Sequence, residues 1–368
     1  MPKKKLHIIS FGNPYPPQYG GAIDVYYKLQ ALSALGVTIY LHYFDNKETE
    51  KEHLELYCEQ VFFYKKKSNI LFLLSKTPYA VLARRNEALI KNLKKIDAPI
   101  LIEGTQCSWI LNDKSFTSRQ LYVRAHNIEE NYYKGLANSE NNKILRLIYR
   151  SQAKKMRNFE THFNNVEGIF TLSKFEQAYF KNRYHTESAY IPVFHGNSDS
   201  AILDGQGNYA LYHGDLSSAD NLRAAIFFIN LFRNIDFPLV IAGNYSSDLE
   251  RMVEKIDNVR LEKIKDNKHL DRLLSGAHIN VIKSFQQSGT KLKLVNSLFK
   301  SRFCIINENV VDDPRIVKLC EVASSKEQFI ELVEKLRATH FSDGGRREVL
   351  NAVYSNKSNA QKIIEKIF

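Results

Sequence analysis

The sequence predicts an α/β protein built from two doubly wound domains of similar design that face a central cleft. Two observations lead to this fold class. Short apolar runs alternate with helical stretches, and this alternation stops once, in a polar segment, before it begins again. The chain has 368 residues, 44% of them hydrophobic and 25% charged, which is enough for two globular domains with sizeable cores.

The first domain is predicted to cover residues 1–192. It begins with the apolar run "LHIIS", and the glycine pair in "PPQYGG" then leads directly into an amphipathic helix. Helical stretches separate the apolar runs, so the sheet is expected to be parallel. The predicted strands are Lys5–Ser10, Thr38–Phe44, Val61–Tyr64, Ile100–Glu103, Leu121–Ala125 and Gly168–Leu172.

The second domain is predicted to cover residues 193–345, after a stretch rich in Gly, Ser, Asn and Asp. Its strand candidates are "YALYHG", "PLVIAGN", "VRLEKI", "INVIKS", "RFCIIN" and "LCEVAS". Residues 346–368 are predicted to form a final helix, free to pack on either domain and so to cross back to the first. Asp266, before "HLDRLL", is expected to cap a helix.

The formal net charge of +12 favours an acidic partner, such as nucleic acid, anionic lipid or a phosphorylated substrate. Nucleic acid is not expected, because the chain has no finger spacing, aromatic ribonucleoprotein motif or basic heptad helix. The four cysteines show no paired metal-ligand spacing, and no apolar run has the length of a membrane helix. These features predict a reduced, cytoplasmic protein without a metal site.

Two glycine-containing turns precede helices and predict an anion-binding site. Gly20 and Gly21 follow the first strand, and "SGT", residues 288–290, precedes a helix expected to carry Lys291 and Lys293. Amides at a helix start and nearby lysines stabilise phosphate groups. The carboxyl ends of the strands in a doubly wound sheet are also where ligands bind.

Nearly the whole chain resembles the GT-B glycosyltransferases, and most closely the family-4 retaining group with two Rossmann-like domains. The resemblance rests on "PPQYGGAIDVYYKLQALSALGVTIYL", "VRAHNIEENYY", "IFTLSKFEQAYF", "YHGDLSSADNLRAAIFFINLF" and "SGTKLKLVNSLFKSRFCIIN". It implies transfer of a sugar from a nucleoside diphosphate sugar to an acceptor hydroxyl, without a metal or further cofactor. The first domain would hold the acceptor and the second the nucleotide.

The resemblance also assigns roles to individual residues. His126 matches a histidine that contacts the transferred sugar, and Gly20 and Gly21 match the paired glycines near the donor phosphates or acceptor. The donor site would further contain Gly289, Thr290, Lys291 and Lys293, of which Lys293 is favoured for the phosphates. Two glutamates of the family, spaced E-x7-E, are replaced by Ser288 and Asn296, which are expected to hydrogen-bond donor hydroxyls.

Glu103 and Arg124 each lie at the end of an apolar run and are candidates to line the cleft. Structural roles are equally open for both and for His126, and Gly20 and Gly21 can also serve only to make a tight turn. Of the charged residues near the strand ends, Lys283 is a further candidate for phosphate neutralisation.

The stretch "FFYKKKSNILFLLSKTPYAVLARRNEALIKNLKK" combines basic residues with an apolar run and predicts contact with an anionic membrane surface. The alternative is a core strand and helix with a solvated basic face. With the resemblance, it suggests peripheral attachment to the inner membrane face and a glycan or lipid-linked acceptor.

Other function classes remain open. A nucleotide-sugar epimerase of GT-B shape needs acid and base carboxylates, for which Glu103 and Glu129 are candidates. A scaffold that binds nucleotide without catalysis is suggested by Ser288 and Asn296, because both lack the charge of the family's glutamates.

Overall fold

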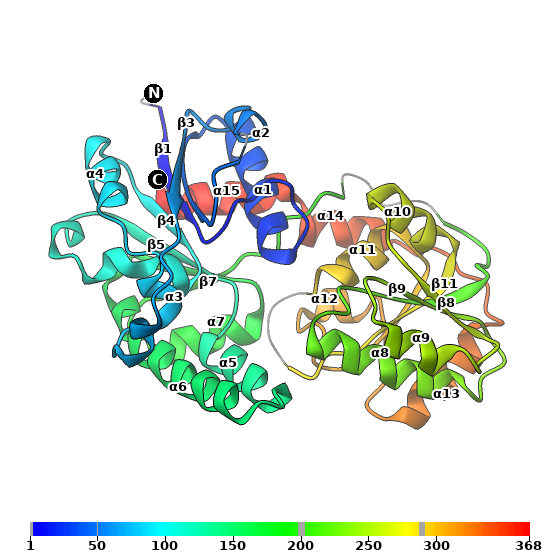
Figure 1. The fold of residues 1–368 in the computed structure, drawn as a ribbon. Helices are drawn as coiled ribbons and strands as arrows, with labels where there is room; N and C mark the ends of the chain where they lie inside the picture. The colour runs from blue at the N-terminus through cyan, green and yellow to red at the C-terminus, as the bar shows by residue number, and fades with distance from the viewer. Residues whose placement is uncertain (1–2, 50, 198–202, 287–290) are drawn as a thin grey trace. The chain divides into compact units, whose positions relative to one another are not determined.

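The computed structural model of the chain describes residues 3–49, 51–197, 203–286 and 291–368 (Figure 1). Residue contacts divide the chain into two units. Unit 1 comprises Met1–Gly196 and Tyr354–Phe368, and unit 2 comprises Asn197–Val353. Each unit is a parallel α/β domain, so the predicted fold class is confirmed. Within the described ranges, no helix has the length and apolar character needed to cross a membrane.

Unit 1 contains seven parallel strands in its described part, in the order β3-β2-β1-β4-β5-β6-β7. They are β1 (Lys5–Ser10), β2 (Thr38–Asp45), β3 (Gln60–Lys65), β4 (Ile100–Glu103), β5 (Leu121–Ala125), β6 (Gly168–Thr171) and β7 (Glu187–Tyr190). The sequence missed only β7. This edge strand buries only Ser188, so it has no apolar run by which to recognise it.

The helices of unit 1 cover both faces of this sheet and form two apolar cores. They are α1 (Gly20–Ala34), α2 (Glu52–Glu55), α3 (Tyr79–Leu82), α4 (Glu87–Lys95), α5 (Glu129–Ser139), α6 (Lys143–Phe159), α7 (Lys174–Arg183) and α15 (Asn356–Ile367). Short 3-10 helices are η1 (Ile70–Leu74), η2 (Thr105–Asn112), η3 (Lys114–Phe116) and η4 (Glu160–Asn165).

The structure divides the helix expected over 346–368 into α14 (Arg346–Tyr354) and α15. Ser355 ends the first and begins the second, because its side chain accepts a hydrogen bond from the Ser358 amide and caps α15. In unit 1, α15 packs against α1 (Figure 1), and its Ile363 and Ile367 share a core with Val25 of α1. The C-terminal helix therefore does return to the first domain.

Unit 2 contains six parallel strands among its described residues, in the order β10-β9-β8-β11-β12-β13. They are β8 (Tyr209–His213), β9 (Leu239–Ala242), β10 (Val259–Glu262), β11 (Ala277–Ile282), β12 (Phe303–Ile306) and β13 (Glu321–Val322). Each lies in a run predicted from the sequence except β11, which begins before its predicted run, 279–284, and overlaps it. The remaining helices are α8 (Ala219–Phe232), α9 (Ser247–Val253), α10 (Asn267–Gly276), α11 (Leu292–Lys300), α12 (Pro314–Val317) and α13 (Lys326–Leu336).

Each sheet has one point where the strand order reverses. In unit 1 this point lies between β1 and β4, and in unit 2 between β8 and β11. The connections leave the two central strands in opposite directions there, which opens a crevice at their carboxyl ends. The functional groups of each unit should therefore be sought beside Ser10 and Glu103, and beside His213 and Ile282.

Candidate active site

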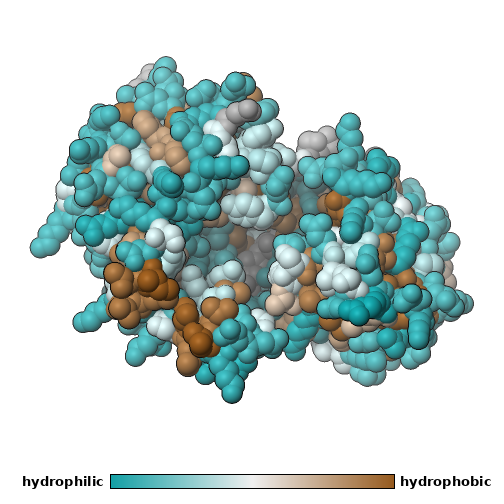
Figure 2. Space-filling view, in the orientation of Figure 1, coloured by the Kyte–Doolittle hydropathy of each residue, from teal (hydrophilic) through white to brown (hydrophobic). Residues whose placement is uncertain are grey.

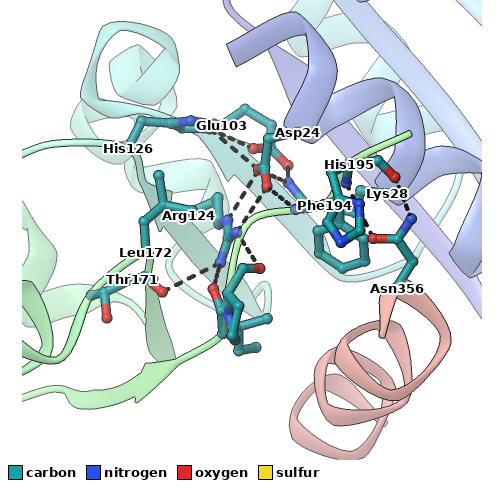
Figure 3. A network of polar contacts seen from close by, with 12 residues as sticks. Asp24, Lys28, Glu103, Arg124, His126, Thr171, Leu172, Phe194, His195 and Asn356 are labelled. Atoms are coloured by element: carbon teal, nitrogen blue, oxygen red, sulfur yellow. Dashed lines mark hydrogen bonds and ion pairs between the residues drawn. The ribbon is translucent and has the colours of Figure 1, made fainter. Parts of the chain in front are cut away.

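A network of buried charged residues lies at the reversal point of unit 1 (Figure 3). Asp24 and Lys28 come from successive turns of α1, which follows β1. Glu103 ends β4, Arg124 lies in β5, and His126 follows that strand. The positions of these residues follow from the topology, because β1, β4 and β5 are neighbours in the sheet.

Short contacts join the members of this network in sequence. Lys28 Nζ lies 2.9 Å from Asp24 Oδ2 and 2.7 Å from Glu103 Oε1. Arg124 donates to both carboxylate oxygens of Asp24, at 2.9 and 3.2 Å. His126 Nε2 lies 2.9 Å from Glu103 Oε2. Glu103 therefore joins the lysine to the histidine.

Both carboxylates are held ionised although they are buried. Burial opposes ionisation of Asp24, but Arg124 and Lys28 outweigh it and hold the Asp24 pKa well below its usual range. For Glu103, burial is again the largest effect, and Lys28 with the His126 hydrogen bond overcomes it, so the pKa is lowered. Two carboxylates thus balance one ammonium and one guanidinium.

Phe11 and Gly21 set the surroundings of His126. The rings of His126 and Phe11 meet edge to face, with centroids 5.3 Å apart. A Cβ atom at Gly21 would overlap the Phe11 ring, so a glycine is required for this packing. Packing against Phe11 therefore accounts for the glycine at position 21, and the predicted role of the Gly20 and Gly21 amides stays a prediction. Gly20 begins α1, whose amino terminus has no side-chain cap.

Arg124 was a candidate to line the cleft or to serve a structural role, and its side chain is completely buried. Its guanidinium also donates to the carbonyl oxygens of Ile191, at 2.6 Å, and Pro192, at 3.1 Å. Asp24 in turn accepts a hydrogen bond of 2.8 Å from the Phe194 amide. The pair holds the segment that leads out of unit 1. Glu103 is equally buried, and its two carboxylate oxygens contact Lys28 and His126.

Asp24, Glu103 and His126 bring three potential metal ligands together, which the sequence analysis did not group. The set does not suit a divalent cation. Lys28 already bonds to both carboxylates, so a metal would have to displace a buried ammonium ion that neutralises them. The electrostatic demand that a metal would satisfy is already met by the protein.

A second pair of buried carboxylates, Glu129 and Glu160, has no cation as a direct partner in the described part of the chain. Burial raises the pKa of Glu129 to about 7 and that of Glu160 to about 8. Thr105 donates to Glu160 at 3.2 Å, and Gln106 donates to Glu129 at 3.4 Å. Glu129, a candidate base for an epimerase, is thus an internal carboxyl that resists ionisation.

In unit 2, Lys293 lies at the reversal point and is partly buried. It projects from α11, and its Nζ donates to Asn221 Oδ1 at 2.7 Å and Tyr212 Oη at 3.1 Å. The ammonium also lies over the Tyr212 ring, 4.7 Å from its centroid. Tyr212 is in β8 and Asn221 is in the first turn of α8, so the lysine reaches the loop that follows the central strand.

Lys293 has no carboxylate within ion-pair distance among the described residues. Burial, and then the charge of Lys291, lower its pKa to about 7. The neighbouring His213 is kept neutral, because burial and Lys293 lower its pKa to about 3. Among the described residues, a hydroxyl, an amide oxygen and an aromatic face contact this cation, and an anionic ligand would neutralise it.

The other predicted donor-site residues are only partly described. Ser288, Gly289 and Thr290 lie outside the described residues. Lys291 is the residue preceding α11 and does not lie on the helix as expected. Asn296 Oδ1 accepts a hydrogen bond from Asn197 at 3.0 Å. Lys283 lies among three aromatic rings, the nearest 4.8 Å away.

Asp266 caps α10 as predicted, because its side chain accepts a hydrogen bond from the His269 amide.

No sequence pattern had predicted a role in the site for Asp24, Lys28, Tyr212 or Asn221. A faint signal for the first two existed, because a carboxylate and a lysine four residues apart share one face of a helix. That helix was predicted to be amphipathic, and the buried face of an amphipathic helix should be apolar. The pair in "GGAIDVYYK" interrupts that face and indicated a buried ionic contact.

Comparison with known proteins supports the fold. The protein is 26% identical over 326 residues to an uncharacterised 44.6 kDa protein from the cps region of Klebsiella pneumoniae, with 82% of each chain covered. Sucrose-phosphate synthase from Thermosynechococcus elongatus matches at a TM-score of 0.71 and 14% identity, with 98% of each chain covered.

Anabaena Alr3699/HepE, solved in complex with UDP, matches at a TM-score of 0.65 and 10% identity, again covering 98% of each chain. The chain has the GT-B glycosyltransferase fold. No family model matches it.

Proposed function

We propose that the chain is a glycosyltransferase that moves a sugar from a nucleoside diphosphate sugar to a hydroxyl of a glycan or lipid-linked acceptor. The proposal is carried by one observation. Lys293 lies at the strand-order reversal of unit 2, and no carboxylate among the described residues pairs with it. A donor diphosphate supplies the missing anion. The UDP in the HepE complex supports a uridine nucleotide, and the relative from a cps region supports a role in polysaccharide synthesis.

In the proposed reaction, the bond between the sugar C1 and the diphosphate oxygen breaks, and a bond forms between C1 and the acceptor oxygen. The proton of the acceptor hydroxyl passes to the departing diphosphate. Lys293 stabilises the charge that develops on this leaving group, together with the amide groups at the start of α11. We also propose that the amides of Gly20 and Gly21, at the start of α1, donate hydrogen bonds to the substrates.

His126 is proposed to contact the transferred sugar, with Glu103 as the positioning residue that holds its ring. Asp24 and Glu103 are buried and paired with cations, so neither is free to attack the sugar. A reaction that retains the configuration would therefore proceed without either carboxylate as a protein nucleophile. The same pairing favours a reaction that needs neither a metal nor a cofactor beyond the donor, and activity should persist in EDTA.

Thermal unfolding with UDP, GDP, CDP and their sugars tests the donor site. Ligands that bind the native state raise the unfolding temperature by mass action. One diphosphate should raise it for the wild type, and Lys293→Ala should remove the increase. Incubation of the selected donor sugar with and without glycan acceptors then separates the functions. Transfer requires an acceptor, an epimerase changes the donor alone, and a scaffold leaves it intact.

Peripheral attachment to an anionic membrane face is part of the proposal, because it would bring the enzyme to lipid-linked acceptors. The composition of the stretch from Phe62 to Lys95 motivates it.

A further inference from the structure

Two segments of unit 1 carry exposed apolar side chains, and these side chains do not pack into its core. In η1, none of the residues is buried, and Ile70, Leu71 and Leu74 are 74%, 63% and 83% exposed. In α6, every fully buried residue lies between Gln152 and Phe159. The first half of this helix therefore projects Ile144 and Leu147 into solvent, at 70% and 64% exposure.

The second half of α6 lies beside η1 and the following helix α3. Lys155 Nζ on α6 donates to the Leu73 carbonyl oxygen at 2.6 Å, and Gln152 accepts the Tyr79 amide at 2.8 Å. Figure 2 shows hydrophobic side chains gathered on this face of unit 1, in the region that carries α3, α5 and α6 in Figure 1. We call this apolar set, Ile70, Leu71, Leu74, Ile144, Leu145 and Leu147, the η1–α6 surface.

Basic residues surround the η1–α6 surface, and acidic residues are missing from both segments. The sequence from Gln60 to Asn86 contains six Lys or Arg and no Asp or Glu, and Lys143–Phe159 also contains six and none. Beside it, a groove of about 450 Å³ between α5 and α6 is lined by Lys134, Arg150, Lys154 and Arg157, with Glu130 as the acidic member.

We propose that the η1–α6 surface docks on an anionic phospholipid bilayer, with its leucines and isoleucines at the acyl boundary and its cations among the headgroup phosphates. An apolar patch bordered by Lys and Arg is the composition of segments that lie in a membrane interface. A second copy of the chain is disfavoured as the occupant. A twofold contact would set the same basic residues against one another.

This inference deepens the proposed function, because it rests on lipid-linked acceptors and assigns the contact to particular residues. It also corrects the surface expected from the sequence. Leu89 and Leu93 of α4 are buried in the core, so Lys91 and Lys95 belong to a solvated helix face. The second half of the surface comes from α6, which the sequence analysis did not consider.

Flotation of the purified protein with vesicles tests the proposal. The wild type should float with vesicles of phosphatidylcholine mixed with phosphatidylglycerol, less with phosphatidylcholine alone, and less at high salt. Leu74→Glu combined with Leu147→Glu should reduce the partition coefficient about tenfold or more. Leu56→Glu is the matched control, since Leu56 is 71% exposed but lies outside the surface, and it should float like the wild type.

The electrostatic contribution is tested in parallel. Arg150→Gln and Lys154→Gln should each weaken binding about fivefold. Lys91→Gln and Lys95→Gln remove the same charge from α4 and should have little effect. Far-ultraviolet circular dichroism and the unfolding temperature without ligand verify that each variant remains folded.

Three results would overturn the proposal. The first is a wild type that does not float with anionic vesicles. The second is a loss of binding in the α4 and Leu56 controls as strong as in the surface variants, and the third is a concentration-dependent dimer that Leu74→Glu abolishes while vesicle binding is absent. A wild type that floats but shows no shift with any nucleoside diphosphate would contradict the proposed donor site and leave the membrane surface supported.

Discussion

Asp24 and Glu103 of unit 1 and Lys293 of unit 2 occupy corresponding places, beside the point where the strand order of their sheet reverses. Their charges are balanced differently. In unit 1, Lys28 and Arg124 neutralise the two carboxylates within hydrogen-bonding distance. In unit 2, the described residues offer Lys293 only a hydroxyl, an amide oxygen and a ring.

The difference indicates separate tasks. A compensated network gains nothing from an added ion and acts as a rigid support, here for His126 and for the chain segment that leaves unit 1. An uncompensated cation binds an anion with a net gain, because the ligand restores a charge that burial disfavours. Substitutions in the two regions should therefore affect different properties, stability in unit 1 and ligand affinity in unit 2.

Removal of one cation from the compensated network should have the largest effect. Arg124→Met leaves the buried Asp24 carboxylate and the carbonyl oxygens of Ile191 and Pro192 without their guanidinium donor. It should lower the free energy of unfolding of unit 1 by about 3–5 kcal/mol. Urea unfolding followed by Trp109, the single tryptophan, reports on this unit. Lys91→Met, at an exposed position of α4, is the control. A loss below about 1 kcal/mol for Arg124→Met would show that the network is not a structural support.

The corresponding change in unit 2 should leave stability nearly intact and reduce affinity. Lys293→Met removes a charge-assisted hydrogen bond to the diphosphate, so calorimetry should show UDP binding about 10- to 100-fold weaker. The free energy of unfolding should change by about 1 kcal/mol or less. Lys300→Met, on the same helix but paired with Asp271, should bind UDP normally. Equal affinities for Lys293→Met and the wild type would remove Lys293 from the donor site.

Unit 1 also contains an uncompensated pair, which sharpens the comparison. Because their pKa values are raised, protonated Glu129 and Glu160 contribute to the free energy of unfolding, and this contribution is fully present below about pH 4.5. It is lost as the pH rises through about 7 for Glu129 and about 8 for Glu160. Glu160→Gln keeps the shape and cannot ionise. It should raise the unfolding free energy at alkaline pH by about 1–2 kcal/mol and change it little in acid. Trp109 fluorescence in urea at both pH values measures this, and an equal gain at both would refute the ionisation argument.

The smallest expected effect is the pH dependence of UDP affinity. Free Lys293 loses its proton near pH 7, and a bound diphosphate raises that pKa, so binding takes up a proton and weakens as pH rises. Between about pH 6.5 and pH 8.5 the affinity should fall about tenfold. Lys293→Met serves as the reference, because it retains the titration of UDP itself. Parallel profiles for both proteins would contradict a titrating lysine at the phosphate.

Local sequence patterns were sufficient for most of the fold. Alternating apolar runs and helices predicted six strands of each sheet at nearly their observed positions, because burial of a parallel strand on both faces requires an apolar run. The same logic predicted that His126 and the helix bearing Lys293 follow strand ends. The edge strand β7 was missed, because a partly exposed strand can use polar residues such as Glu187 and Ser188.

The arrangement of charges depended on tertiary structure. Lys28 meets Glu103 across 75 residues, and Arg124 meets Asp24 across 100, distances at which composition and periodicity carry no information. The η1–α6 surface arises in the same way from two separate segments. By itself, the sequence determined which segments are buried, since hydrophobic patterning is local. Which buried charges are neutralised, and which cation lacks a carboxylate partner, was decided only when the strand order brought distant residues together.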